Sequence, residues 1–437
     1  MTTLTLASGA TIEIDEELYM FVKKEVVPGT GKSVDEVFSV LGELVVQFDP
    51  KNQELLSKRT ARQAKIDEYY LAKRKAGWEP IESSAAQDAI EIGQFLVAEG
   101  YLEPETNVEV SMTTPELDFE MSQNGPELVT PVNIASMAVG GANARWGSLY
   151  DAYFLSDIHP EIDRDSGRAE RLQMVVDQTN EYLDSNVAQW ENGRGFNDLQ
   201  SYSVNQTAGA YTLSGHTADG VEVGLQEPAR FVGFNQNGDQ LTEFFLEDNG
   251  LKIQFQLYDG GTVDPDNGQF KDLIVESAVT NIVDFEDAVA IVDAEDMVLA
   301  LRNYLGLIKG DIETSSSRGA LKVINQDINF TGADGSAQTV KGTSLMSVRN
   351  VSLHMYTDMI TVDGKRISER MLGVLLTTLI ATAHDKGSDV RGPNSRKGYV
   401  YQVTPKLQTA EEVAEQVRFF KAVEERLGLA KNTMLIG

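Results

Sequence analysis

Through much of residues 15–100, apolar residues recur at three- and four-residue spacing with charged residues between them. This period is typical of α-helices that place one face against a core. The clearest segments are 33–48 and 53–77, and Ser33 followed by Glu36 predicts a capping box at the start of the first. A further helix is predicted over 85–100, capped by Ser83 or Ser84 and ended by Gly100.

The pattern changes after this helical region. Residues 101–130 are extended and loop-like, and ELVTPVNIASMAV (127–139) predicts a buried strand that leads to a helix or turn at 142–154. Residues 165–190 again predict a helix. Residues 200–280 are β-rich, and the NGDQ and DNGL tetrapeptides between their alternating runs are hairpin signals.

From residue 280 onward, short apolar strands alternate with amphipathic helices. The helices are predicted at 294–307, 369–387 and 410–429. With the earlier strand, the strands are predicted at 127–133, 280–286, 344–350, 398–404 and 432–436. This order favours a parallel sheet covered by helices, and a closed barrel of this kind needs eight strand–helix units. The pattern predicts an α/β fold with a partial (β/α)8 TIM barrel of about five strands.

The composition excludes several kinds of site and makes some partners unexpected. There is no cysteine, which excludes disulfides, thiolate nucleophiles and zinc–sulfur sites. Lys+Arg 37 against Asp+Glu 67 gives a net charge of −30, which repels nucleic acid and anionic membranes, so we expect neither as a partner. The acidic opening is unlike a signal peptide and no apolar stretch is long enough to span a bilayer, so we expect a cytoplasmic protein.

A charged group follows two of the predicted strands. Asp284, Glu286 and Asp287 come at the carboxyl end of one strand, where barrel sites lie, and paired carboxylates suit a divalent metal or its waters. A helix N-cap cluster is an equally good interpretation. Arg349 ends the next strand and could bind a carboxylate or a developing enolate, although a salt bridge to the acidic group is slightly favoured. Lys406, after the following strand, is a second candidate cation with less support than Arg349.

Other candidate motifs give weaker evidence of function. GTGKS (29–33) lacks the first glycine of a phosphate loop, where Val26 stands, and DPDNG (264–268) is better read as a turn than as a calcium loop. The four histidines are far apart without ligand spacing, so each is expected to be structural: His159, His216, His354 and His384.

Several long strings, in order and spread over nearly the whole chain, resemble the malate synthases of the G type. They are KEVVPGTG (24–31), GYLEPETNVEV (100–110), ANARWGSLYDA (142–152), VDFEDAVAIVDAEDMVLALRNYLGLIKGD (283–311), SLMSVRNV (344–351), YQVTPKLQTAEEVAEQV and ERLGLAKNTMLIG. The resemblance implies an N-terminal helical clasp, a (β/α)8 barrel and an inserted α/β, β-rich domain. The implied parts are the clasp and linker (1–125), first barrel strand (126–144), insert (145–275), barrel (276–307), second part of the insert (308–342) and incomplete barrel (343–437).

The family condenses acetyl-CoA with glyoxylate to malate and CoA, as in the glyoxylate cycle, with Mg²⁺. By resemblance, Arg349 matches the arginine that stabilises the enolate and orients glyoxylate. Asp284 and Glu286 match carboxylates that support the waters of the metal, and Val129 matches a position beside the CoA adenine. The resemblance also suggests a monomer.

This chain departs from the family pattern at several positions. Ser136 stands where a CoA-contacting arginine is usual, Ala288 replaces a serine, a paired-arginine segment is reduced at Lys322–Val323, and His354 is displaced by one position. The family's direct metal ligands and its catalytic aspartate correspond to positions after Gly437, so residues 1–437 alone are expected to be inactive. The alternatives are an enzyme like malyl-CoA lyase and a non-catalytic fragment that serves as a binding or assembly module.

Overall fold

The structure is a computed structural model, and it describes residues 1–437 except 81–84, 103–115, 124, 164–166, 265–268 and 316–318. Ser83 and Ser84, proposed as a helix cap, therefore lie outside the described residues, as does most of the DPDNG segment. Within the described ranges, no helix has the length and apolar character that crossing a membrane requires.

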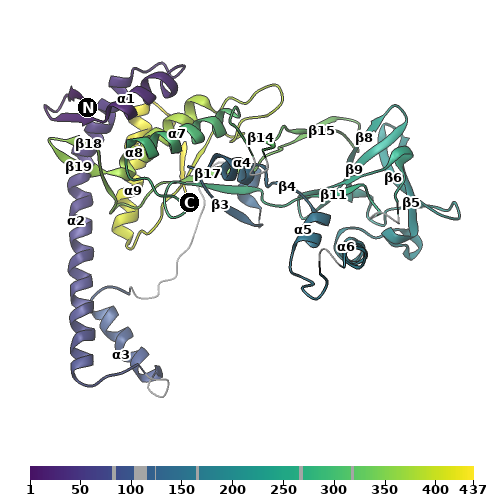
Figure 1. Cartoon of the computed structure of the whole chain (residues 1–437), viewed down its shortest axis with the longest axis horizontal. Helices are drawn as coiled ribbons and strands as arrows, with labels where there is room; N and C mark the ends of the chain where they lie inside the picture. Colours follow the sequence, from purple (N-terminus) through teal and green to yellow (C-terminus); the bar gives the residue numbers. More distant parts are fainter. Residues whose placement is uncertain (81–84, 103–115, 124, 164–166, 265–268, 316–318) are drawn as a thin grey trace.

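A five-stranded sheet lies at the centre of the molecule (Figure 1). Its strands, in spatial order, are β21 (Met434–Ile436), β20 (Val400–Val403), β17 (Leu345–Arg349), β12 (Thr280–Asp284) and β3 (Glu127–Pro131). Every neighbouring pair is parallel. The five predicted strands and their parallel arrangement are confirmed, while closure of this sheet into a barrel stays a prediction.

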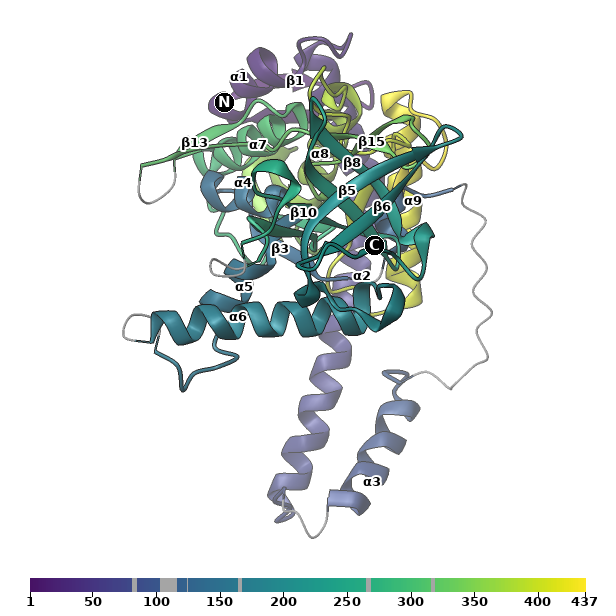
Figure 2. The same cartoon turned by 90° about the vertical axis from the view of Figure 1, so that its right-hand side faces the viewer.

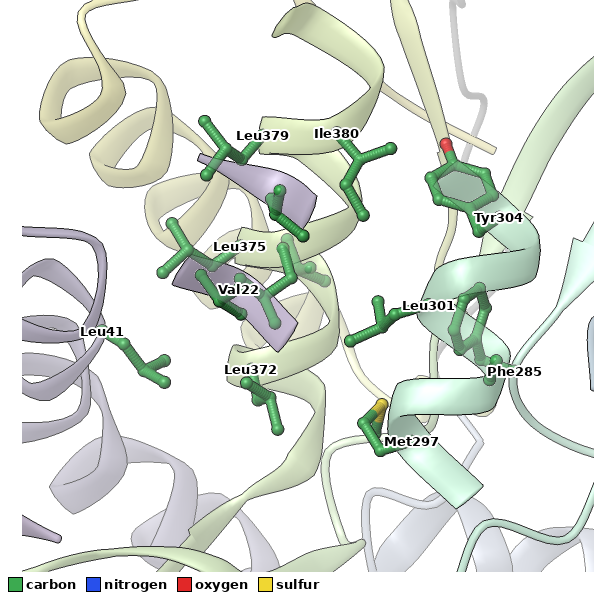
Figure 3. Close-up of a cluster of buried hydrophobic side chains, with 14 of the residues drawn as sticks. Val22, Leu41, Phe285, Met297, Leu301, Tyr304, Leu372, Leu375, Leu379 and Ile380 are labelled. Atoms are coloured by element: carbon green, nitrogen blue, oxygen red, sulfur yellow. The ribbon is translucent and has the colours of Figure 1, made fainter. Parts of the chain in front are cut away.

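The predicted helices follow these strands in the chain. They are α7 (Ala294–Lys309), α8 (Glu369–His384) and α9 (Ala410–Leu427). Figure 3 shows the core where α7 and α8 meet, with Leu301, Leu372 and Leu375 among its buried side chains. Helix α8 is apolar almost all round, because both the sheet and α7 cover it.

The prediction of one strand over 127–139 is wrong. Strand β3 ends at Pro131, which has no N–H for the ladder, and residues Ala135–Asn143 form helix α4. This helix lies close to the sheet because its residues are small. A Cβ on Gly141 would come within 2.4 Å of the Thr130 side chain. The strand is also less buried than expected, since Val129 is 45% exposed.

The N-terminal region contains β-structure that the sequence patterns did not indicate. A four-stranded sheet joins the first residues to a segment after β17, in the order β1 (Thr2–Thr5), β2 (Thr11–Ile14), β18 (Tyr356–Val362) and β19 (Lys365–Ser368). Helix α1 (Glu16–Phe21) and a π-helical turn at Val22–Val26 follow β2. The strands of this sheet are short and pair far along the chain, which is why local periodicity missed them.

One continuous helix, α2 (Val34–Lys75), replaces the two predicted segments. Its capping box is confirmed: the Ser33 hydroxyl accepts the Glu36 N–H at 3.2 Å, and the Glu36 carboxylate accepts the Ser33 N–H at 2.6 Å. Pro50 lies inside the helix without ending it. The last turns of α2 extend from the molecule with α3 (Ala85–Ala98) beside them, as Figures 1 and 2 both show.

A second lobe contains the β-rich residues (right side of Figure 1). Its seven-stranded sheet has the order β16 (Ala337–Val340), β15 (Ile328–Gly332), β8 (Phe231–Asn237), β9 (Gln240–Asp248), β10 (Leu251–Gln256), β11 (Asp272–Glu276) and β4 (Trp146–Ser148). Both predicted hairpins are present, with Gly238 in one turn and with Asn249 and Gly250 in the other, all three at positive φ.

Smaller elements complete this lobe. A three-stranded sheet comprises β5 (Leu199–Thr207), β6 (Ala210–Thr217) and β7 (Glu222–Gly224). A two-stranded sheet of β13 (Glu313–Ser315) and β14 (Leu321–Val323) lies outside the lobe, where it contacts α4. The helices are α5 (Leu149–Leu155) and α6 (Arg168–Tyr182). The aromatic core of the lobe is separate from the core around α8 and includes Phe244 and Phe255.

Candidate active site at the carboxyl ends of the parallel strands

Two neighbouring strands of the parallel sheet bring Asp284 and Arg349 together. Strands β12 and β17 are paired in register, so Asp284 lies directly beside Arg349 at the carboxyl ends of both. The guanidinium donates through Nε and Nη2 to the two carboxylate oxygens, each at 2.8 Å. The salt bridge weighed in the sequence is therefore present, and it is the two-point geometry that fixes a guanidinium most firmly.

Asp284 is completely buried and its remaining hydrogen bonds come from the backbone. The N–H groups of Glu286 and Ala288 donate to it at 3.0 and 2.8 Å. Burial by itself raises the pKa of this carboxyl, but the bonds from Arg349 and these two N–H groups outweigh burial and hold the pKa below its ordinary value. Asp284 is thus a fixed anion that closes the turn after β12.

The helix-cap interpretation of the acidic group is wrong. Helix α7 starts at Ala294, and Asp293 caps it by accepting the N–H of Asp296 at 3.1 Å. Asp284 and Glu286 precede this cap by several residues. They belong to the turn at the end of the strand.

Lys406 joins Asp284, Glu286, Asp287 and Arg349 in a charged cluster at the carboxyl ends of the strands, called the rim below. Its Nζ lies 3.1 Å from Glu286 Oε1 and 2.7 Å from Asp287 Oδ1. Glu286 also accepts the Ser352 N–H at 3.1 Å, and 6% of its side chain is exposed. Two cations and three carboxylates therefore meet at one end of the sheet, where α/β enzymes bind their ligands.

The rim residues do not by themselves supply the ligands for Mg²⁺. Both oxygens of Asp284 are committed to Arg349 and the backbone, and Glu286 Oε1 is shared by Lys406 and Ser352. Among the described carboxylate oxygens of Asp284, Glu286 and Asp287, Glu286 Oε2 is the one that is buried without a protein partner. No group of three or more metal-binding side chains was found in the described part of the chain. Mg²⁺ requires near-octahedral coordination by oxygen, which these described rim side chains do not provide.

Val129 lies one strand away from the rim. Strand β3 pairs with β12 so that Val129 is beside Ile282 and Pro131 beside Asp284. Since alternate residues share a face of a sheet, Val129 faces the same side as Asp284. Ser136 lies in the first turn of α4, where Lys322 Nζ is 3.5 Å from its carbonyl oxygen. Lys322 therefore places a cation beside the first turn of α4.

Several polar residues near the rim were missed by the sequence analysis. Arg370 of α8 is 3% exposed, and its Nε and Nη1 have no hydrogen-bond partner. Burial lowers its pKa to about 10. Ser352 is buried, and Arg59 of α2 reaches the loop that carries Lys406. A charged residue within an apolar helical stretch was the available signal for Arg370, whereas nothing local marked Arg59.

The remaining candidate residues are the four histidines and the GTGKS segment. Ser203 Oγ lies 2.8 Å from His216 Nε2, the Val26 carbonyl 2.7 Å from His384 Nε2, and Glu161 Oε1 2.9 Å from His159 Nδ1, whereas His354 is exposed. The GTGKS residues form the turn before α2, and the serine of that segment is the helix cap.

Fold and rim together define the class, an α/β protein whose parallel sheet carries a charged site at the carboxyl ends of its strands. The family description "Malate synthase, TIM barrel domain" matches residues 345–437, and "Malate synthase, N-terminal domain" matches residues 17–73. Two segments of the chain are therefore similar to domains of the malate synthases.

Curated relatives extend the match to nearly the whole chain. Malate synthase G of Halalkalibacterium halodurans is 34% identical over 436 residues, which are 98% of this chain and 58% of the relative. The malate synthases G of Corynebacterium efficiens and Corynebacterium glutamicum are 33% and 34% identical, again over 98% of this chain and over 56% of each relative. The chain therefore spans less than two thirds of the length of these relatives.

Proposed function

We propose that the protein containing these residues condenses acetyl-CoA with glyoxylate to form malate and free CoA. The observation that carries the proposal is the Asp284–Arg349 pair at the carboxyl ends of β12 and β17. It lies within segments that resemble the G-type enzymes, and the curated relatives are named malate synthase G.

The reaction needs a group that stabilises negative charge on the thioester oxygen. The acetyl methyl group loses a proton to a base, the resulting carbon attacks the aldehyde carbon of glyoxylate, and water then hydrolyses the thioester to release the CoA thiol. Arg349 uses Nε and Nη2 for Asp284, which leaves Nη1 without a protein partner in the described structure. With 19% of its side chain exposed, the guanidinium can donate to the enolate oxygen.

Asp284 positions this guanidinium. Because the carboxylate is buried and held by two backbone N–H groups, it fixes both the plane and the location of the arginine before substrate arrives. A donor that is already oriented stabilises developing charge without reorganisation.

We propose that acetyl-CoA lies over β3 and the start of α4. The exposed Val129 offers an apolar contact for the adenine, and Lys322 beside the Ser136 carbonyl offers a cation for a phosphate. This arrangement substitutes a lysine from β14 for the arginine that this chain lacks at Ser136.

Other predictions from the resemblance stay proposals. They are a requirement for Mg²⁺, the division into clasp, barrel and insert, a monomeric state and a cytoplasmic location. In support of the proposed insert, β15 from the 308–342 segment pairs with β8 from the 145–275 segment. We also propose that residues 1–437 alone are inactive, since their rim lacks a set of metal ligands in the described residues.

The test is a thiol-release assay on the protein purified from its complete reading frame, with acetyl-CoA, glyoxylate and Mg²⁺. We expect malate and free CoA in equal amounts, and no product when glyoxylate is omitted. Glyoxylate release from malyl-CoA without net malate synthesis would instead identify a lyase. Absence of both reactions in a folded protein would favour the non-catalytic alternative.

A further inference from the structure

Lys406 occupies a backbone conformation that lysine rarely adopts. Its φ is 57°, in the left-handed region that is unfavourable for a residue with a Cβ. It follows β20 in the loop that leads to α9, and its ammonium bridges Glu286 and Asp287. A conformation of this kind persists only where surrounding contacts determine it.

One such contact comes from the long helix α2. The Nη2 group of Arg59 donates to the carbonyl oxygen of Lys406 at 2.8 Å. The same guanidinium binds both carboxylate oxygens of Glu412 in α9, at 2.6 and 2.7 Å. Glu412 is almost completely buried, and it also accepts the N–H of Gln408 from this loop at 2.6 Å. Arg59 therefore holds the Lys406 loop in two ways, directly through the Lys406 carbonyl and indirectly through Glu412, which binds the Gln408 N–H.

Lys406 in turn contacts the turn that holds Asp284. The N–H groups of Glu286 and Ala288, on either side of Asp287, are those that donate to Asp284. A displacement of the Glu286 and Asp287 side chains would move this turn. The contacts thus form a continuous path from α2 to the Asp284–Arg349 pair.

A second basic residue lies behind the path. Arg370 is close enough to Glu286 and Glu412 for both to favour its charged form, while Arg59 disfavours it. It lines a cavity of about 30 Å³ together with Glu412 and Gln416, whose Nε2 also has no partner. That volume accommodates about one water molecule. Glu286 therefore interacts with the charge of the buried Arg370 as well as with that of the exposed Lys406.

We propose that Lys406 is a positioning residue for Glu286 and Asp287, and that Arg59 of α2 sets the place of Lys406. This inference rests on the proposed function for its catalytic meaning, although the path itself can be tested without activity. On this proposal, the positions of the rim side chains depend on the contact between α2 and α9.

The experiment compares backbone hydrogen exchange in five variants of the protein from its complete reading frame, one of which combines Lys406→Met with Arg59→Lys. Lys406→Met removes the ammonium from an exposed position. Arg59→Lys keeps a charge for Glu412 but loses the fork that reaches the Lys406 carbonyl. The matched controls are Lys51→Met, which removes another α2–α9 ion pair, at 2.6 Å from Glu411, and Arg302→Lys, which alters a two-point pair with Glu25.

Both test variants should raise the exchange rate of the Glu286, Ala288 and Ser352 amides by about tenfold. The first two bond to Asp284 within the turn that Lys406 contacts, and the third bonds to Glu286 itself. In the double variant the increase should be no larger than in Lys406→Met alone, since both act through the same contact. The controls should leave these amides unchanged. Equal exchange in Lys406→Met and Lys51→Met would overturn the proposal, as would additive effects in the double variant.

Thiol release gives a separate readout. In both test variants kcat/KM should fall by about tenfold, and in Lys406→Met the thermal midpoint should match those of the controls. Wild-type kcat/KM in Lys406→Met would contradict a positioning role. If the wild-type protein releases no thiol, the proposed function fails, and the exchange rates still decide the path from Arg59.

Discussion

At the residue scale, the candidate site depends on a charge that is removed from water and fully compensated. Asp284 is inaccessible to solvent, and four donated hydrogen bonds satisfy its two oxygens. Burying a carboxylate is costly, and removing one partner of such a pair is more costly still because the other charge is left buried. The pair therefore restricts what Arg349 can be replaced by.

Arg349→Lys should lower the free energy of unfolding by about 3 kcal/mol, because an ammonium cannot donate the two parallel bonds that Asp284 accepts. Urea unfolding monitored by circular dichroism measures the change. Arg302→Lys is the control, since Arg302 forms the same fork with Glu25 on the exposed surface and should change the free energy by less than about 1 kcal/mol. Equal losses in the two variants would contradict this account.

Glu369 should make stability depend on pH. It is 6% exposed at the start of α8, and burial raises its pKa from 4.5 to about 7. Below about pH 4.5 the group is protonated in both the folded and unfolded states. As the pH rises from about 4.5 to about 7, the group ionises in the unfolded state first, so the free energy of unfolding falls.

Glu369→Gln should therefore match the wild type in acid and be more stable by about 3 kcal/mol near pH 8. Urea unfolding of both proteins at several pH values measures the difference. A difference that does not vary with pH would show that Glu369 is ionised at little cost.

At the element scale, the sequence predicted the parts whose periodicity reflects their burial. The strands of the parallel sheet and helices α7, α8 and α9 were found within a few residues, because each is apolar on the faces that the fold covers. Helix α4 was missed because small residues such as Ala138 and Gly141 give no helical stripe. The helical pattern was predicted as two segments, 33–48 and 53–77, whereas α2 continues between them through Pro50, with buried residues spread from Val34 to Leu55.

The same limit applies to the site. Asp284 and Arg349 could be predicted because both end apolar strands, and their pairing follows from the register of neighbouring parallel strands. Arg59 could not be predicted, because its contact with Lys406 joins residues 347 positions apart. Sequence patterns show which element carries a charge, whereas tertiary packing determines which charges meet.

The cap of α2 allows an element-scale prediction. Ser33→Ala removes the hydroxyl that accepts the Glu36 N–H, and it should lower the free energy of unfolding by about 1 kcal/mol. Ser57→Ala in the exposed part of the same helix is the control, because the Ser57 hydroxyl only bonds back to the Gln53 carbonyl. That variant should be neutral or slightly stabilising. Urea midpoints for the two variants test the assignment, and a larger loss in Ser57→Ala would contradict it.

At the scale of the whole molecule, two hydrophobic cores define two units. One surrounds α7 and α8 (Figure 3), and the other is the aromatic core beneath the seven-stranded sheet. Phe255→Ala should lower the stability of the second unit by about 4 kcal/mol. Hydrogen exchange should then rise in β8–β11 but not in β12 and β17. Leu375→Ala in the first core should give the reverse pattern, and uniform exchange in both variants would show that the cores unfold together.

The most direct test of the central claim is the kcat/KM for thiol release by Arg349→Lys, in the protein from its complete reading frame with acetyl-CoA, glyoxylate and Mg²⁺. The two-point pair with Asp284 fixes the guanidinium that we propose stabilises the enolate, so kcat/KM should fall by about 100-fold or more. Arg302→Lys should keep wild-type activity. A kcat/KM for Arg349→Lys equal to that of the wild type would show that the Asp284–Arg349 pair is not part of the site.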